Sequence, residues 1–233
     1  PWPLLPEGSF LAIAILPVIA WLIAKKTKSI LFTGITSLLG LLSVTLIAPL
    51  IYTLGYGFDG FLHLASQKLL FESGTLNPKP LYYIVQYAFT NWVSRLIEID
   101  LVHIDRFLVP IGISIIMLSL FLTLKRTKEN ALAISGVAGL LMLSPFVATT
   151  PQAFAYIIGL SALILSFGTS DNIHPILPLV LGAWCLAIHP LAGLPFIGAI
   201  ATILWASRCS TKEKSALRSP IMYLLILGSA ASV

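Results

Sequence analysis

The sequence predicts an all-α, polytopic transmembrane protein with about eight spanning helices and two juxtamembrane helices in one large outer loop. Two observations predict this class. Of the 233 residues, 58% are hydrophobic and only 10% are charged, whereas a soluble domain carries about 25% charged residues. The apolar residues also form long runs separated by short basic clusters, which is the pattern of a multi-pass membrane protein. We read residues 1–233 as a single transmembrane domain.

The predicted spanning segments follow one another along the chain and are interrupted once by a polar stretch. The first is an extra N-terminal helix, and residues 30–233 form the main module. In order, the predicted spans are residues 10–24, 30–56, 107–124, 131–149, 153–168, 173–188, 191–207 and 220–233. The chain has no starting methionine and stops inside an apolar run, so we expect it to be a fragment of a longer protein.

The polar stretch, residues 57–106, is predicted to be the large outer loop and carries five of the nine acidic residues. Residues 58–73 have the periodicity of an amphipathic helix that Gly74 ends. One face of this helix is apolar, and the other is polar; the polar side chains are Asp59, His63, Ser66 and Gln67. Residues 81–97 are predicted to be a second helix, with its polar side chains largely on one side: Gln86, Thr90, Asn91, Ser94 and Arg95.

The basic residues predict the topology. Residues 25–28, 125–128 and 208–218 hold ten of the fourteen Lys and Arg residues. The positive-inside rule places all three clusters in the cytoplasm if residues 81–97 lie along the interface instead of crossing. The expected localisation is therefore the cell membrane, with residues 57–106 on the outer side.

Charge and cysteine usage exclude two classes of function. The net charge of +5 does not indicate nucleic-acid binding, because the basic residues lie in short clusters between apolar runs. The two cysteines, Cys185 and Cys209, provide no disulfide framework and no metal-binding spacing.

Three short motifs resemble the GT-C membrane glycosyltransferases. An Asp in an amphipathic helix, then Gly, then Lys-Pro-Leu-Tyr-Tyr at residues 79–83 resembles their first outer loop, most closely in the protein O-mannosyltransferase and aminoarabinose transferase branch. Phe-Asp-Gly-Phe at residues 58–61 is similar to the metal-associated aspartate loop of oligosaccharyltransferase catalytic subunits. Arg-Phe-Leu-Val-Pro at residues 106–110 resembles the Arg-Leu-Pro that opens the next spanning helix.

This resemblance implies transfer of a sugar from a polyprenyl-phosphate-linked donor to an acceptor at the outer face of the membrane. The implied partners are that donor, membrane lipid and an acceptor glycan, lipid or protein. Asp59 would act as the catalytic base, or would hold a divalent cation (Mg or Mn) together with His63. The next outer loop, residues 149–152, lacks the second acid of many family members. The enzyme is then metal-independent, uses Glu72 or Asp105 instead, or is inactive.

The remaining candidate residues would bind the substrate. Lysine and arginine side chains suit the leaving phosphate, and ring side chains suit the sugar or the aqueous cleft. The candidates are Lys79, Arg95 and Arg106, with Lys68 as a fourth cation, and His63, His189, Tyr82 and Tyr83. Each also has a simpler interpretation as an interface anchor or an aromatic-belt residue.

Two other functions compete with the enzyme. A lipid-linked-sugar transporter would carry ionisable residues inside its spanning helices, and residues 30–56, 107–124 and 131–149 carry none well inside. A non-catalytic multi-pass scaffold is favoured by the missing second acid. The concentration of polar residues in the outer loop favours the enzyme.

Overall fold

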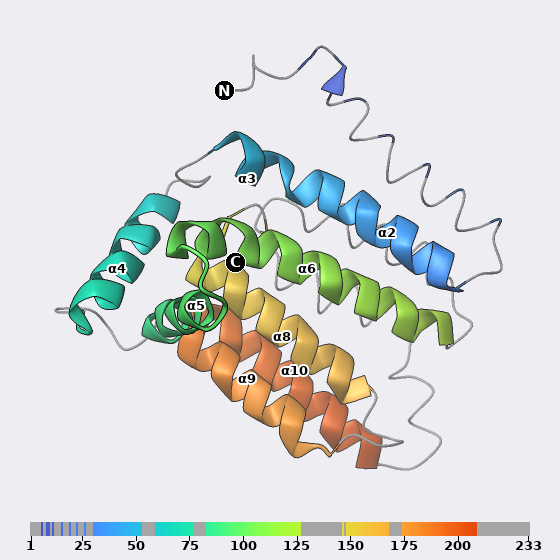
Figure 1. The fold of residues 1–233 in the computed structure, drawn as a ribbon. Coiled ribbons are helices and arrows are strands. Elements are labelled where there is room, and N and C mark those ends of the chain that lie inside the picture. The colour runs from blue at the N-terminus through green and yellow to red at the C-terminus, as the bar shows by residue number, and fades with distance from the viewer. Residues whose placement is uncertain are drawn as a thin grey trace. The chain divides into compact units, whose positions relative to one another are not determined.

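The computed structural model describes residues 30–52, 59–76, 83–126, 148–167 and 174–208, with Phe146 and isolated positions before residue 30. Eight α-helices form this part of the chain, so the all-α prediction is confirmed there (Figure 1). They are α2 (Ile30–Thr45), α3 (Ile47–Ile51), α4 (Gly60–Ser73), α5 (Ile84–Ile97), α6 (Leu101–Arg126), α8 (Pro151–Phe167), α9 (Ile176–Ile188) and α10 (Pro190–Arg208).

The predicted transmembrane architecture is wrong for this part of the chain. Among the described residues, no helix combines the length and the apolar character that crossing a membrane requires. Helices α2, α8 and α9 have 16, 17 and 13 residues, whereas a span needs about 20. The prediction of about eight spanning helices is therefore wrong for the described residues. The predicted multi-pass localisation in the cell membrane, with the basic loops in the cytoplasm, is not supported either.

Several predicted segments lie largely or wholly outside the described residues. The predicted spans at residues 10–24 and 131–149 lie largely outside the described residues, and the span at 220–233 lies wholly outside them. Most of the basic clusters at residues 25–28, 125–128 and 208–218 also fall outside the described side chains.

A proline divides the longest predicted span into two helices. Pro49 has no N–H to donate to the carbonyl of Thr45 one turn earlier, and its ring crowds that carbonyl. Helix α2 accordingly ends at Thr45, and α3 begins at Ile47 with only 5 residues. The apolar run at residues 30–56 was counted as one helix because its composition is continuous, although its backbone hydrogen bonding is not.

The two helices predicted in the polar stretch are confirmed. Helix α4 covers most of the predicted segment 58–73 and ends where predicted, because Gly74 has a φ of +72° and donates its N–H to the carbonyl of Leu70 at 3.0 Å. Glycine adopts this left-handed conformation without a steric cost. Helix α5 covers the later part of the predicted segment 81–97.

A tight three-residue connection joins α5 to α6. Glu98 has a φ of +55°, and the N–H of Ile99 donates to the carbonyl of Ser94 at 3.2 Å, which is the hydrogen bond of a Schellman C-cap. Asp100 then caps α6, because its Oδ1 accepts the N–H of Val102 at 2.8 Å. This connection sets the direction in which α6 leaves the end of α5, and so it helps to place Asp105 in the second turn of α6.

The chain forms two compact units. Residues 1–68 and 90–150 form the first unit, and residues 69–89 and 151–233 form the second, so the boundary falls within α4 and α5. In the first unit α2 packs along α6. Buried apolar side chains there include Ala48, Val109 and Ile113.

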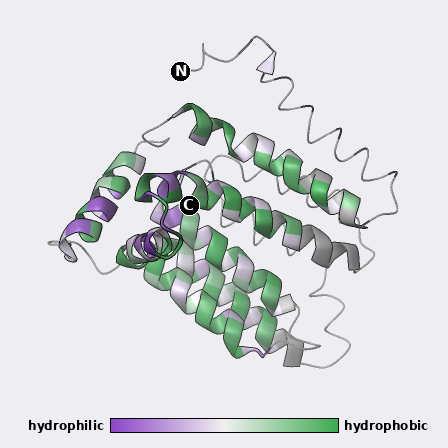
Figure 2. Ribbon diagram, in the orientation of Figure 1, coloured by the Kyte–Doolittle hydropathy of each residue, from purple (hydrophilic) through white to green (hydrophobic). Residues whose placement is uncertain are grey.

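The second unit contains a bundle of three helices, α8, α9 and α10, each of which packs on the other two. Figure 2 shows these helices mostly in hydrophobic colours, whereas α4 carries several hydrophilic residues. Glycines allow the helices to approach closely. A Cβ on Gly193 of α10 would collide with the backbone of Leu186 in α9, and one on Gly159 of α8 would collide with the ring of Phe196 in α10.

Candidate functional site

A cluster of buried polar side chains in the first unit joins α4, α5 and α6. Its centre is Gln67 of α4, which has no exposed surface. The Nε2 of Gln67 donates to Asp105 Oδ1 at 2.5 Å, and its Oε1 accepts from the hydroxyl of Thr90 at 2.6 Å. Its backbone carbonyl accepts from Asn91 Nδ2 at 3.2 Å. One glutamine is therefore hydrogen-bonded to both α5 and α6, and we call these four residues the Gln67 cluster.

Asp105 is the titratable member of the Gln67 cluster. It lies in the second turn of α6 and is buried. Burial disfavours the charged carboxylate and raises the pKa of Asp105 from 3.8 to about 7, against the lowering effect of the hydrogen bond from Gln67. The carboxyl group therefore exchanges its proton near neutral pH. Asn91 Oδ1 is also buried and has no hydrogen-bond partner in the described part of the chain.

Polar side chains are buried on α5, and large apolar side chains are exposed on α4. The buried residues of α5 include Gln86, Thr90, Asn91 and Ser94, which are members of the polar side predicted from the sequence. On α4, Phe61 is 56% exposed and Leu62 is 53% exposed. This arrangement is the reverse of an ordinary surface helix, so these two helices present apolar side chains for a further partner.

Asp59, the predicted catalytic base, is exposed and directly precedes the first residue of α4. Its backbone carbonyl accepts the N–H of His63 at 3.1 Å, so the two residues are one helical turn apart, as predicted. The imidazole of His63 is half-buried. The carboxylate of Asp59 is thus accessible to a substrate, whereas the carboxyl group of Asp105 is not.

Arg106, a predicted phosphate ligand, follows Asp105 in α6 and is half-buried. Its Nε donates a hydrogen bond to the carbonyl of Pro49, and its guanidinium lies 5.3 Å from the centre of the Phe107 ring. The hydrogen bond uses one of the five N–H donors of the guanidinium. Arg95 lies in the last turn of α5 and is exposed. Lys68, the fourth cation, is exposed on α4.

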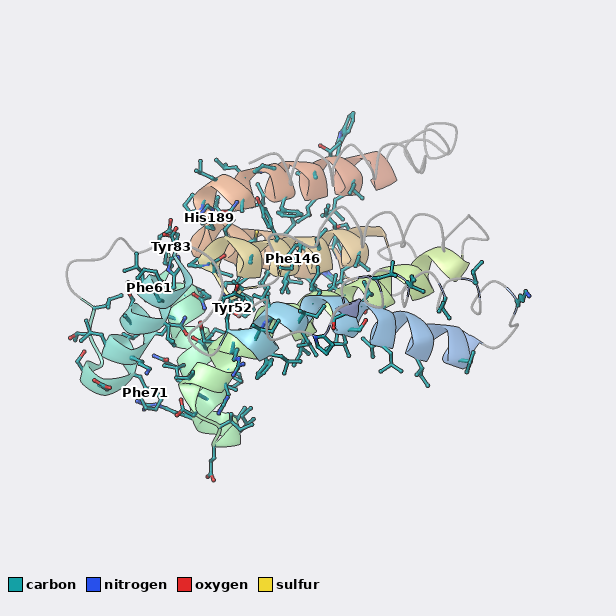
Figure 3. All side chains as sticks on the ribbon, turned by 90° about the horizontal axis from the view of Figure 1, so that it is seen from above. Tyr52, Phe61, Phe71, Tyr83, Phe146 and His189 are labelled. Atoms are coloured by element: carbon teal, nitrogen blue, oxygen red, sulfur yellow. The ribbon has the colours of Figure 1, made fainter. Side chains whose placement is uncertain are left out.

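The structure brings together two predicted residues in the second unit, Tyr83 and His189. Their rings are stacked, with centroids 5.6 Å apart (Figure 3). The backbone N–H of Tyr83 donates to the carbonyl of Ile188 at 3.1 Å. Tyr83 has a φ of +78°, a conformation that is strained for a bulky side chain and that clusters at functional sites.

The environment of His189 favours the neutral form of its imidazole. Burial lowers the pKa of His189, although a backbone hydrogen bond raises it in part. Its Nδ1 accepts the N–H of Ala192 at 3.3 Å, which caps the first turn of α10 at Pro190. The proton of the neutral ring is then on Nε2. The break between the predicted segments 173–188 and 191–207 falls at His189, between α9 and α10.

Two predicted site residues, Lys79 and Tyr82, lie outside the described residues. The structure gives no support to the predicted Mg or Mn site in the part that it describes, because no three His, Cys, Asp or Glu side chains there are arranged to hold a metal ion. The sequence places Cys185 in an apolar run, and its thiol is buried and donates to the carbonyl of Ala155 at 3.1 Å. Burial raises the pKa of Cys185 to about 12, so this thiol is inert.

The Gln67 cluster was not predicted as a site. Gln67, Thr90 and Asn91 were recognised as members of polar helix faces, and Asp105 only as an alternative acid. The available signal was two consecutive helices with several uncharged polar side chains on one face each. Such faces need hydrogen-bond partners when they are buried, and here the two faces supply partners for one another.

Comparison with protein-family models found no match, and the searches of curated proteins and of solved structures found no significant similarity to this chain. The resemblance to the GT-C glycosyltransferases therefore stays a prediction based on the three motifs alone.

Proposed function

We propose that this chain acts in glycosyl transfer, moving a sugar from a prenyl-phosphate donor to an acceptor hydroxyl, with Asp59 as the proton acceptor. The observation that carries the proposal is an exposed carboxylate at the start of a helix that hydrogen bonds hold in place. Asp59 is exposed at the start of α4, and Gln67, two turns later, is hydrogen-bonded to α5 and α6. A catalytic group needs this combination of access and fixed position.

The proposed reaction is a displacement at the anomeric carbon of the sugar. The acceptor oxygen forms a bond to that carbon while the bond from the carbon to the phosphate oxygen breaks. The prenyl phosphate leaves with the electron pair, and the hydroxyl proton passes to the carboxylate of Asp59. General-base catalysis of this kind contributes about a hundredfold or more to the rate.

Two other features of the first unit suit this donor. Arg106 would bind the leaving phosphate, because a guanidinium oriented by one hydrogen bond still offers donors in a planar fork. The exposed side chains of Phe61 and Leu62 on α4 would contact the apolar prenyl chain.

A second candidate function is a non-catalytic scaffold. It is favoured by large exposed apolar side chains on α9 and α10, including Ile176, Val180, Leu191, Leu194 and Trp205. Side chains of this kind, when they gather on one surface, mark binding sites for other molecules. The two candidates differ in whether any carboxylate is essential.

The test measures release of farnesyl phosphate from farnesyl-phosphate mannose, glucose and arabinose by the full chain, with octyl glucoside as the acceptor. We expect Asp59→Asn to lower the rate about a hundredfold or more without changing stability. The matched control is Glu98→Gln, which removes an exposed carboxylate from the connection between α5 and α6 and should leave the rate unchanged. Full activity in Asp59→Asn would remove Asp59 from the mechanism, and an inactive wild-type chain would favour the scaffold.

A further inference from the structure

We propose that Asp105 is a positioning residue that acts through Gln67 to hold in place the helix beginning beside Asp59. The effect on glycosyl transfer rests on the proposed function, whereas the effect on α4 itself does not. The proposal concerns a residue that is buried and therefore does not touch a substrate.

The hydrogen bonds of Gln67 carry the argument. Its side-chain amide donates to α6 through Asp105 and accepts from α5 through Thr90, at 2.5 and 2.6 Å. Because the NH₂ and the oxygen each face the matching partner, the amide has one orientation that satisfies both. Removing one partner would leave a buried polar group unsatisfied, which is costlier than losing the hydrogen bond alone.

Helix α4 connects Gln67 to Asp59, so a movement of the helix at Gln67 also moves Asp59. Eight residues separate the two, which corresponds to about 12 Å along a helix. A rotation or fraying of α4 at Gln67 therefore moves the carboxylate at its start. Because a displacement of about 1 Å can cost a hundredfold in rate, the position of Asp59 depends on Asp105 without contact between the two.

The other charged groups on the joined helices do not replace Asp105. Within the described residues, they are His63 and Lys68 on the first-unit part of α4, Arg95 on α5, and His103 with Arg106 on the first turns of α6; Glu72 lies beyond Lys68 on α4. All of them are half-buried or exposed, whereas Asp105 is buried. Helix α2, which packs on α6, carries no titratable side chain.

The charge of Asp105 gives the proposal a pH dependence that a simple packing role lacks. The pKa of Asp105 is raised to about 7 by burial, so above neutral pH a buried charge develops beside Gln67. A buried charge with incomplete hydrogen bonding is unfavourable. The hold on α4 should therefore weaken as the pH rises from about 4 to about 7 and stay constant above that.

Amide hydrogen exchange on the full chain tests the proposal directly. In Asp105→Leu, we expect exchange in α4 to rise at least about tenfold, with α8, α9 and α10 unchanged. Asp105→Asn keeps an acceptor for Gln67 and should restore protection. Ser66→Ala is the matched control, because among the described residues the Ser66 hydroxyl bonds to the carbonyl of Leu62 within its own helix and to no other helix.

A pH comparison keeps the proposal falsifiable if Asp105→Leu does not fold. After correction for the intrinsic exchange rate, wild-type α4 should lose protection between about pH 4 and pH 7, and Asp105→Asn should not. Equal pH dependence of α4 in these two proteins, or unchanged exchange in a folded Asp105→Leu, would overturn the proposal.

The catalytic consequence is measured separately. With farnesyl-phosphate mannose as the donor, Asp105→Leu should lower kcat about tenfold or more with little change in KM, and Asp105→Asn should recover it. If the wild-type chain releases no farnesyl phosphate, the proposed function fails, and the exchange result still decides whether Asp105 positions α4.

Discussion

In the first unit, helices α4, α5 and α6 are joined by hydrogen bonds to one buried side chain, Gln67. In the second unit, α8, α9 and α10 are joined by apolar side chains and by glycines that let the helix backbones approach. Both arrangements exclude water, but they respond to different changes. Hydrogen bonds depend on donor, acceptor and protonation, whereas apolar packing depends on volume.

The two units should therefore respond differently to a change in pH. A hydrogen-bonded centre such as Gln67 sets the orientation of a helix and changes with pH through Asp105. The three-helix bundle of the second unit contains a buried thiol, Cys185, whose pKa is raised to about 12, and that group does not titrate near neutral pH. We therefore expect pH dependence near neutral pH to reside in the first unit, whereas in the second unit burial lowers the pKa of the His189 ring.

The largest effect expected from a glycine substitution is among the packed helices of the second unit. In Gly193→Ala, the new methyl group would meet the backbone of Leu186, which cannot move aside as a flexible side chain does. We expect a loss of about 3 kcal/mol in the free energy of unfolding, at the upper end of overpacking costs, measured by urea denaturation. The loss should be the same at pH 5 and pH 8.

Gly198→Ala is the matched control on the same helix, because nothing lies within 4 Å of its added methyl group. Alanine should be neutral there or stabilise α10 by about 1 kcal/mol. Equal effects of the two substitutions would show that close backbone approach does not hold α9 and α10 together.

A smaller effect is expected at the connection that sets the geometry of the first unit. Glu98 has a φ of +55°, which costs a residue with a side chain about 1 kcal/mol. Glu98→Gly should therefore stabilise the protein by up to about that amount in thermal unfolding. Gly74 has a φ of +72°, so Gly74→Ala should have the opposite sign. A destabilised Glu98→Gly variant would mean that the side chain of Glu98 contributes more than its strain costs.

The sequence predicts the helices better than it predicts their environment. The polar faces of α4 and α5 were recognised from their spacing, and both helices end where Gly74 and Ile97 indicated. Periodicity defines which residues share a face, but not which face turns inward. Gln67 and Thr90 are buried because each is the hydrogen-bond partner of the other, and that pairing joins residues 23 positions apart.

The errors have equally specific causes. The apolar run at residues 30–56 was taken as one span although Pro49 lies within it and divides α2 from α3. Asp105 was treated as part of an outer loop because it precedes the apolar run, whereas α6 begins earlier, at Leu101, after the cap provided by Asp100. The stacking of Tyr83 on His189 could not be predicted, since the strained backbone of Tyr83 has no counterpart in the amino-acid pattern.

The central claim is that Asp105 is a buried carboxyl group and that its protonation stabilises the folded chain. Between pH 3.8 and about 7 the unfolded chain is ionised at this position while the folded chain keeps its proton, so stability falls as pH rises through this range and is constant above it. The decisive measurement is the free energy of unfolding of the wild type and of Asp105→Asn from pH 4 to pH 8. We predict that the wild type loses about 4 kcal/mol relative to the variant over this range. Parallel stability curves for the two proteins would contradict the account.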